Sequence, residues 1–481
     1  MKTRNFALIL ALLMAAGTIS CGDAPVDPST DTTAAGTTVA ETADSLPADL
    51  DFGGETLTFL IRSDLSLAEF DVQEQTGDIV DDAIYARNLK VAERLNVAFE
   101  LVGKPCTYGE RHNFNQNIIN SVMAGDNMYD IVAGYSQAVA GLAPQGMLND
   151  LMETEYLNFD QPWWPANLQS QSRINNKLYF ASGDISTNSL INLYGCYFNK
   201  QLLDDFKLDS PYELVKSGNW TLDTMFAMTE NLYADLNGNN QKDPEDRFGL
   251  AIYEVYSDGI FIGSDMTFIE QDSDGAPILS SDLESERIIT MLEKFTSHMH
   301  TGNDNLILVW GEYPTFHNGN NLFGFDELLY SITHLRSVPF DYGILPIPKL
   351  DAAQENYCTA ASNPYMLYGI PLSAKDPDMV SAVLEALASE SYYSVTPALF
   401  ETALKVKYTR DDESAQMFDI IRETVVFDCG RLFADSFNSL SWSLVRNALN
   451  TGDTGWASVY ASNKSALESH LDALIASFDG E

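Results

Sequence analysis

The sequence predicts an α/β protein that is built from two bodies of mixed strands and helices. The chain has 481 residues, which is more than one hydrophobic core usually holds. Strand-like and helix-like segments alternate over its first part in the order β-α-β-α-β, and that order favours a mostly parallel sheet. A second set of such segments follows residue 170. No repeat of 20–50 residues is present, so solenoids and propellers are excluded.

The first body opens at about Asp51 with a segment of alternating and then continuous apolar residues. The expected strands are 56–61, 97–102 and 129–133, and the expected helices are 81–95 and 113–123. In parallel sheets, ligands sit at the carboxyl ends of strands. Tyr135 follows the third strand and is therefore a candidate ligand contact. The alternative is a loop aromatic that packs on its own body.

The second body shows the same two periodicities. Its expected strands are 178–180, 190–198, 249–252 and 322–325. Its expected helices are 221–233, 284–295, 377–389, 414–426 and 456–478, each with an apolar face.

The charge balance restricts the function. The 27 Lys and Arg residues stand against 69 Asp and Glu residues, for a net charge of −42. Such an acidic surface repels phosphate backbones and anionic headgroups, which disfavours binding to nucleic acid or to a membrane through a basic patch. The composition suits a body outside a cell that binds neutral or cationic small molecules.

Residues 1–21 have the pattern of a secretory signal. Lys2 and Arg4 precede a 14-residue apolar stretch, which is too short to span a bilayer. Thr-Ile-Ser-Cys at 18–21 resembles a bacterial lipobox, so we expect Cys21 to carry a lipid. Thr18 departs from the usual Leu or Val, and an ordinary cleaved signal that contains a cysteine is the alternative.

The next segment, 22–50, is made mostly of small and polar residues without aromatics before Phe52, so we expect a disordered tether. No other run of 18 apolar residues occurs, and the lipid would be the only anchor. We therefore expect the folded body on the extracellular face of the membrane, in a bacterium with a single membrane. The remaining cysteines, Cys106, Cys196, Cys358 and Cys429, are widely spaced, and we expect buried small hydrophobes in place of a zinc or iron–sulfur site.

Several degenerate motifs occur in a fixed order along the chain. They are Asn-Lys-Leu-Tyr-Phe at 176–180, Leu-Tyr-Gly-Cys-Tyr-Phe-Asn-Lys at 193–200, Gly-Asn-Trp-Thr-Leu-Asp at 218–223, Phe-His-Asn-Gly-Asn-Asn-Leu-Phe at 316–323 and Tyr-Gly-Ile-Leu-Pro-Ile-Pro-Lys at 342–349. Together, and behind a lipobox and tether, this series resembles the extracellular solute-binding proteins of bacterial ABC importers, in the group that includes maltose-binding protein.

The resemblance implies a two-lobed, periplasmic-binding-protein-like fold of class II, with the ligand cleft between the lobes. By analogy, the first lobe comprises 53–180 plus 355–395 and the second comprises 185–352 plus 396–478. The partners it implies are a small-molecule ligand and the transmembrane subunits of an ABC permease, with the protein itself a monomer.

The motifs also have direct structural interpretations. Thr221 is expected to cap a helix, with Trp220 packed beneath it. Asn318-Gly319 supplies a turn with positive φ. Pro346 and Pro348 end a strand because they lack a backbone donor. These are scaffold roles.

One loop has the spacing by which oxygen ligands wrap a hard cation. Its predicted ligands are the side chains of Asp235, Asn237, Asn239, Asp243 and Asp246 and the backbone carbonyl of Gln241. The loop resembles an EF-hand or dockerin calcium loop, so we expect structural Ca²⁺. Asn240 stands where Gly usually makes the sharp turn, and Asp246 is shorter than the usual Glu. A metal-free surface loop is the alternative.

Enzyme signatures are sparse, and we expect no enzymatic activity. Gly-x-Ser-x-Gly, Walker, Gly-x-Gly-x-x-Gly and His-Glu-x-x-His motifs do not occur. With 69 carboxylates, no pair stands out as a glycosidase acid and base.

The residues that remain suit sugar recognition, in which aromatic faces stack on C–H surfaces and planar polar groups bind hydroxyls. The candidate ligand contacts, besides Tyr135, are Trp163, Trp164, Asp184, Asp265 and Trp310. Core packing or loop support is the alternative for each of them. We therefore expect capture of a sugar or oligosaccharide by cleft closure, although the composition equally allows a peptide. The competing functions are a surface carbohydrate-active hydrolase and a lipoprotein that adheres to polysaccharide without transport.

Overall fold

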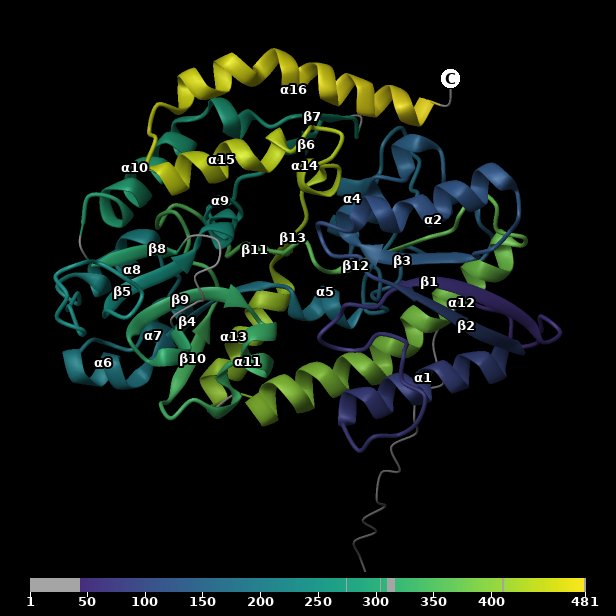
Figure 1. Ribbon diagram of the computed structural model, residues 1–481, viewed down its shortest axis with the longest axis horizontal. Coiled ribbons are helices and arrows are strands. Elements are labelled where there is room, and N and C mark those ends of the chain that lie inside the picture. Colours follow the sequence, from purple (N-terminus) through teal and green to yellow (C-terminus); the bar gives the residue numbers. More distant parts are fainter. Residues whose placement is uncertain (1–43, 274, 303, 309–315, 409–410, 480–481) are drawn as a thin grey trace, which may run out of the picture. The chain divides into compact units, whose positions relative to one another are not determined.

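Figure 1 shows a computed structural model that describes residues 44–479 except 274, 303, 309–315 and 409–410. The expected signal segment, the expected lipid attachment residue Cys21 and most of the expected tether lie outside the described residues. In the described part of the chain, no helix is both long and apolar enough to cross a membrane. The description below concerns the unit that runs from Thr42 to Glu481.

Within the described residues, the first main sheet has the strand order β12-β3-β1-β2. The bounds are β1 (Glu55–Arg62), β2 (Val97–Lys104), β3 (Ile131–Tyr135) and β12 (Met366–Gly369). β1 pairs in parallel with β2 and β3, whereas β12 pairs antiparallel to β3. A strand from residues 366–369 thus completes a sheet that begins at residue 55.

Helices cover both faces of this sheet. In Figure 1, α1 (Ile79–Leu95) and α2 (Arg111–Ala124) lie on opposite sides of it. Leu57, Phe59 and Ile61 of β1 share an apolar cluster with α12 (Pro377–Glu390), whereas Leu60 belongs to the cluster that contains α2. Successive residues of a strand point to opposite faces, so a continuous apolar run is what a strand buried on both faces requires.

The second main sheet has the order β10-β4-β9-β5-β8 among the described strands. Its strands are β4 (Tyr194–Asn199), β5 (Phe248–Tyr253), β8 (Asn305–Leu308), β9 (Asn321–Glu327) and β10 (Tyr342–Leu345). β5 is parallel to β8 and β9, and β4 is antiparallel to β9 and β10. α8 (Leu222–Thr229) contacts β5, α10 (Glu286–Met299) contacts β8, and α13 (Asp412–Glu423) contacts β10.

Three segments carry the chain from one sheet to the other. The first segment contains α5 (Thr187–Ile191) and runs beside the second segment. Isolated β-bridges join the two segments, one from Ala181 to Tyr368 and one from Leu193 to Ala361. The third follows α12 as π-helical turns over Ser391–Val395 and Ala398–Tyr408. The lobe boundaries given above stay a prediction.

Shorter elements complete the fold. The remaining helices are α3 (Ser136–Ala140), α4 (Ala166–Ser172), α6 (Lys200–Phe206), α7 (Pro211–Lys216), α9 (Asp258–Gly263), α11 (Leu329–Thr333), α14 (Cys429–Leu432), α15 (Leu440–Thr451) and α16 (Trp456–Asp479). β6 (Ile269–Gln271) pairs with β7 (Pro277–Leu279), and β11 (Thr359–Ala360) pairs with β13 (Val425–Val426).

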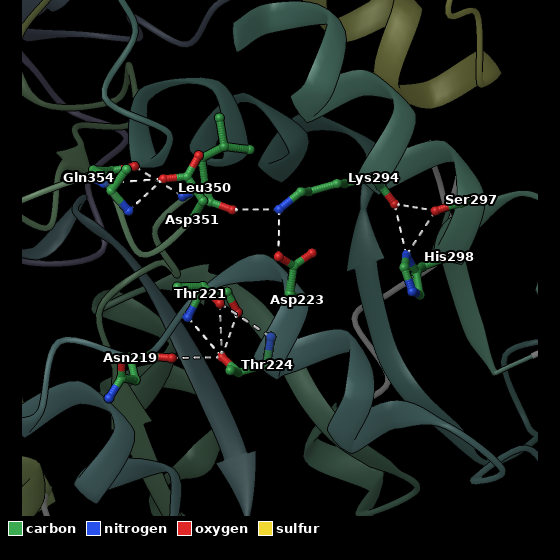
Figure 2. A network of polar contacts seen from close by, with 11 residues as sticks. Asn219, Thr221, Asp223, Thr224, Lys294, Ser297, His298, Leu350, Asp351 and Gln354 are labelled. Carbon is green, nitrogen blue, oxygen red and sulfur yellow. Dashed lines mark hydrogen bonds and ion pairs between the residues drawn. The ribbon is translucent and has the colours of Figure 1, made fainter.

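The expected cap at Thr221 is confirmed. Thr221 is the N-cap of α8, and Thr224 completes a reciprocal capping box. In the same network (Figure 2), Lys294 of α10 lies 2.6 Å from the carboxylate of Asp223 and donates to the carbonyl of Leu350. Trp220 is fully buried and donates its ring N–H to the carbonyl of Pro346. This end of α8 is therefore joined to the segment that leaves β10.

Most expected elements agree with the structure to within a few residues, but four do not. The helix expected over 221–233 ends at Thr229. Residues 178–180 form no strand, because the N–H of Leu178 donates to the side chain of Asp150. The expected strand 190–198 begins only at Tyr194, since α5 occupies its start. The helix expected over 414–426 ends at Glu423, after which Val425 pairs with Thr359 in β13. Gly319 has the expected positive φ of 80°, and the four described cysteines are buried and unpaired.

Candidate ligand-binding site

The ends of four strands, two from each sheet, bring polar and aromatic side chains together. We call this set the central cluster, and it comprises Arg62, Tyr135, Tyr194, Asp258, Glu327 and Arg431. Arg62 and Tyr135 are the last residues of β1 and β3. Tyr194 is the first residue of β4 and is paired in register with Glu327, the last residue of β9. Asp258 begins α9 and Arg431 lies in α14.

Arg62 links the first sheet to the segment that returns from the second. Its guanidinium donates to Asp64 at 2.7 Å and 3.0 Å, and to the carbonyl of Pro364 at 2.7 Å. The same group lies over the ring of Tyr135, 5.4 Å from the centroid. This position suits a cation–π contact. Arg62 is buried, so its three partners fix the planar group in place.

Asp258 is held by two arginines. Arg431 approaches its carboxylate to 2.6 Å, and the Nε of Arg446 approaches to 2.7 Å. Burial works to raise the pKa of Asp258, but the charges of Arg446 and Arg431 outweigh it and lower the pKa. Arg446 also lies over the ring of Trp442 at 4.0 Å. Asp258 is therefore ionised, and the three charges together leave one net positive charge here.

The end of β9 carries two adjacent carboxyl groups. Asp326 accepts from the hydroxyl of Tyr256 at 2.8 Å, while its Oδ2 is buried without a partner. Burial raises the pKa of Asp326 well above its usual range, and burial also raises the pKa of Glu327. The Ser362 side chain and the charge of Arg62 work in the opposite direction on Glu327. A bound polar group that donates hydrogen bonds would relieve this desolvation.

The charges of several members of the cluster act on the pKa values of its two tyrosines. Burial raises the pKa of Tyr135, and the charges of Arg62, Arg431 and Glu327 also act on it. Burial raises the pKa of Tyr194 to about 12, with contributions from Asp258 and Arg431. The cluster therefore offers guanidinium donors, carboxylate acceptors and aromatic rings contributed by both sheets. That set is suited to a ligand with several hydroxyl groups.

Tyr135 is the one predicted ligand contact that the structure places in this cluster. Trp163 and Trp164 lie outside the central cluster. Both rings are buried in the apolar core that includes α12, and their contact with a ligand stays a prediction. Trp163 has no exposed surface and contacts the ring of Tyr392, with 6.2 Å between centroids. Trp164 donates its ring N–H to the buried carboxylate of Glu385 at 2.8 Å.

The other predicted contacts lie elsewhere. Asp184 is buried in the first linking segment, outside the central cluster, where its carboxylate contacts Thr396 and Arg422. Asp265 is exposed beyond the far end of α9, with φ 57°, and its carboxylate lies 3.3 Å from the thiol of Cys358. Trp310 lies outside the described residues.

Sequence reasoning missed most of the cluster. Arg62 and Glu327 are the last residues of strands that were expected from periodicity, so the rule that selected Tyr135 also applies to them. Asp258 and Arg431 gave no such signal, because they meet through a packing of α9 and α14 that no local pattern encodes.

The loop predicted to bind calcium is folded by its own side chains. Asp235 accepts from the N–H groups of Gly238 and Asn240, and Asn240 has a positive φ of 57°. Asn237 and Asn239 both donate to the carboxylate of Asp243. Asp246 is fully buried and accepts from Leu236 and Tyr233.

Asn240 thus makes the turn that Gly usually makes in such loops. The amide groups of Asn237 and Asn239 converge on Asp243, and rotation of each amide would direct its oxygen to the same place. In the described part of the chain, no three His, Cys, Asp or Glu side chains gather as a metal site, so amide and backbone oxygens would have to supply part of the ligand set.

Comparison with solved structures identifies the fold. A maltose-binding periplasmic protein from Listeria monocytogenes in complex with maltose has a TM-score of 0.54 and 15% identity, over 88% of this chain and 97% of that one. The galacto-N-biose/lacto-N-biose I-binding protein of the ABC transporter from Bifidobacterium longum, in complex with lacto-N-biose, has a TM-score of 0.58 and 9% identity, over 88% and 98%. UgpB from Mycobacterium tuberculosis in complex with glycerophosphocholine has a TM-score of 0.53 and 14% identity, over 87% and 99%.

The α/β prediction and the predicted resemblance are therefore confirmed at the level of the fold. The chain has the two-lobed, class II fold of maltose-binding-protein-like solute-binding proteins. No protein-family model matches the sequence, and no curated protein matches it. At identities of 9–15%, the likeness defines the architecture and not the ligand.

Proposed function

We propose that this protein is an extracellular substrate-binding lipoprotein that captures a sugar or oligosaccharide at the central cluster and delivers it to an ABC permease. The observation that carries the proposal is the origin of the cluster. Arg62 and Tyr135 end strands of one sheet, while Glu327 ends a strand of the other. A ligand bound here would contact both halves of the fold at once.

The chemistry of the cluster favours a polyhydroxyl ligand. Arg62 and Arg431 are planar donors, Glu327 is a planar acceptor, and Tyr135 and Tyr194 offer ring faces. The Listeria and Bifidobacterium proteins are in complex with maltose and lacto-N-biose, which supports the sugar class. The glycerophosphocholine complex of UgpB marks the alternative of a charged, non-sugar solute on the same fold.

Capture would proceed by a population shift between open and closed arrangements. A ligand that contacts both halves only in the closed form stabilises that form by its differential affinity. The linking segments would absorb such a change, and they are joined to one another by bonds such as that from the hydroxyl of Thr396 to Asp184.

Incubation of the purified chain with a mixture of oligosaccharides would test capture. We expect one intact glycan per protein by native mass spectrometry, and compaction on binding by small-angle scattering. Turnover of the glycan would instead identify a surface hydrolase. Binding to polymer alone, without compaction, would identify an adhesion lipoprotein.

The anchor and the calcium ion belong to the same proposal. Cys21 would carry the lipid, and 22–50 would form the tether at the extracellular face of a single-membrane bacterium. Replacement of Cys21 by Ser should release the protein into the medium and abolish labelling by a fatty-acid analogue. Structural Ca²⁺ in the loop formed by residues 235–246 would stabilise the second lobe without taking part in ligand capture.

A further inference from the structure

One large cavity lies away from the central cluster. It has a volume of about 930 Å³ and lies between residues 159–176 and the β6–β7 hairpin. None of its lining residues belongs to the central cluster. Ligand sites of small molecules commonly have volumes of about 300–1,000 Å³. The cavity is therefore large enough for several sugar rings.

The walls of the cavity are held by side-chain bonds. Gln169 donates to the carbonyls of Phe159 and Trp164, both at 3.0 Å. The ring of Trp164 is fixed from behind by Glu385 and lies against the ring of Phe159, with 5.6 Å between centroids. Across the cavity, Gln271 of β6 donates to the carbonyl of Ser170. The frame is thus fixed by residues of α4, α12 and the hairpin.

Other polar side chains of the cavity have unused hydrogen-bonding capacity. The side chains of Asp160, Gln161 and Asn176 form no hydrogen bond with another described residue. The guanidinium of Arg173 contacts only the sulfur of Met152, at 3.4 Å, and pairs with no carboxylate among the described residues. Its Nε is shielded from solvent and has no partner. The half-buried guanidinium of Arg173 therefore forms no other hydrogen bond with a described residue, and it lines the cavity.

The lining also indicates the class of ligand. One carboxylate and one guanidinium balance each other, and amide groups supply most of the other polar contacts. Amides, a carboxylate and a guanidinium are the planar groups that bind sugar hydroxyls, and the half-buried ring of Phe159 offers an apolar surface beside them. Asp160 and Asn176 at its edge are exposed, so a chain longer than the cavity can continue into solvent.

We propose that this cavity, which we call the α4 groove, is a second carbohydrate site that binds a segment of a neutral polysaccharide chain. It would hold the protein on polymer while the central cluster takes a soluble fragment. The proposal does not depend on capture at the central cluster, because the two sites share no side chain.

Affinity electrophoresis of the full-length chain in native gels with glycogen, dextran, galactomannan or xyloglucan tests the α4 groove. We expect at least one of these neutral polymers to retard the wild type. The double variant Gln161→Ala/Arg173→Met should weaken the retardation at least tenfold, and Gln161→Ala alone should weaken it to a smaller degree. Gln161→Ala removes a side chain without partners, so it keeps the test valid if the double variant fails to fold.

Two controls separate this site from the central cluster. Arg336→Met removes an exposed arginine that lies outside the groove and should leave the retardation unchanged. Glu327→Gln, a change in the central cluster, should also leave it unchanged. The proposal is overturned if none of the four polymers retards the wild type, if the groove variants migrate like the wild type, or if Glu327→Gln abolishes the retardation.

Discussion

Asp184 accepts a hydrogen bond from the hydroxyl of Thr396, with 2.5 Å between the two oxygens, and this bond joins two of the segments that link the sheets. Burial raises the pKa of Asp184 to about 6, while Thr396 and the charge of Arg422 work to lower it. The bond therefore stabilises the ionised form of a carboxyl group in the first linking segment.

We expect Thr396→Val to destabilise the protein most at alkaline pH. At pH 8, Asp184 is ionised and loses its hydroxyl donor, which should lower the free energy of unfolding by about 1–3 kcal/mol. At pH 5, Asp184 is protonated and the loss should be smaller. Urea unfolding at both pH values measures the difference. Thr451→Val, which removes an exposed hydroxyl bound to the carbonyl of Asn447, is the matched control; equal effects of the two variants would contradict the assignment.

Glu385 should make the stability of the protein fall as the pH rises from about 4.5 to 7. Burial raises its pKa from 4.5 to about 7, and the N–H groups of Trp164 and Asn158 only partly compensate. Between these values the folded state holds a proton that the unfolded state has lost. The difference between the two pKa values corresponds to about 3 kcal/mol that is present below pH 4.5 and lost above pH 7.

Glu385→Gln tests this directly. The amide oxygen can accept the same two hydrogen bonds without a buried charge, so the variant should be more stable than the wild type at pH 8. At pH 5 the difference should nearly vanish. Thermal unfolding across this range measures it, with the exposed Glu468→Gln as control. A gain that is equal at pH 5 and pH 8 would show that Glu385 does not titrate as its burial implies.

Glu327→Gln should weaken ligand capture without weakening the fold. The pairing of β9 with β4 fixes the backbone of Glu327, and burial raises the pKa of its carboxyl group. The neutral amide of Gln is therefore tolerated at this position. The substitution replaces one of two acceptor oxygens by a donor, and we expect an affinity at least tenfold lower for the glycan that native mass spectrometry identifies. Isothermal titration calorimetry measures the affinity, and Glu468→Gln again serves as the reference. Unchanged affinity would remove Glu327 from the site.

Periodicity predicted the elements of the first sheet because each is local. The strand 56–61 and the helix 81–95 are observed as β1 and α1, with ends that differ by one or two residues. The same reasoning missed β12, whose four residues pair with β3 from more than 200 residues away. Long-range pairing of so short a strand leaves no periodic signal in its own sequence.

The site was predicted less well than the fold, and the two tryptophans explain why. Consecutive Trp163 and Trp164 suggested exposed rings, since one core does not easily take both. The structure accommodates both because Tyr392 packs on one ring and Glu385 accepts from the other. Both partners come from the segment after β12, which the local sequence around the tryptophans does not reveal.

Calcium should stabilise the loop that contains Asp235 and Asp243. Without an ion, Asp235 is satisfied by the N–H groups of Gly238 and Asn240, while Asn237 and Asn239 donate to Asp243. A bound ion would recruit the amide oxygens in place of these donors and would neutralise repulsion among the carboxylates. We expect calcium titration to raise the melting temperature and EDTA to lower it. Asp235→Ala should abolish both responses, whereas Asp472→Ala on the exposed face of α16 should leave them intact. A wild type whose melting does not respond to EDTA would show that the loop is held by its own side chains alone.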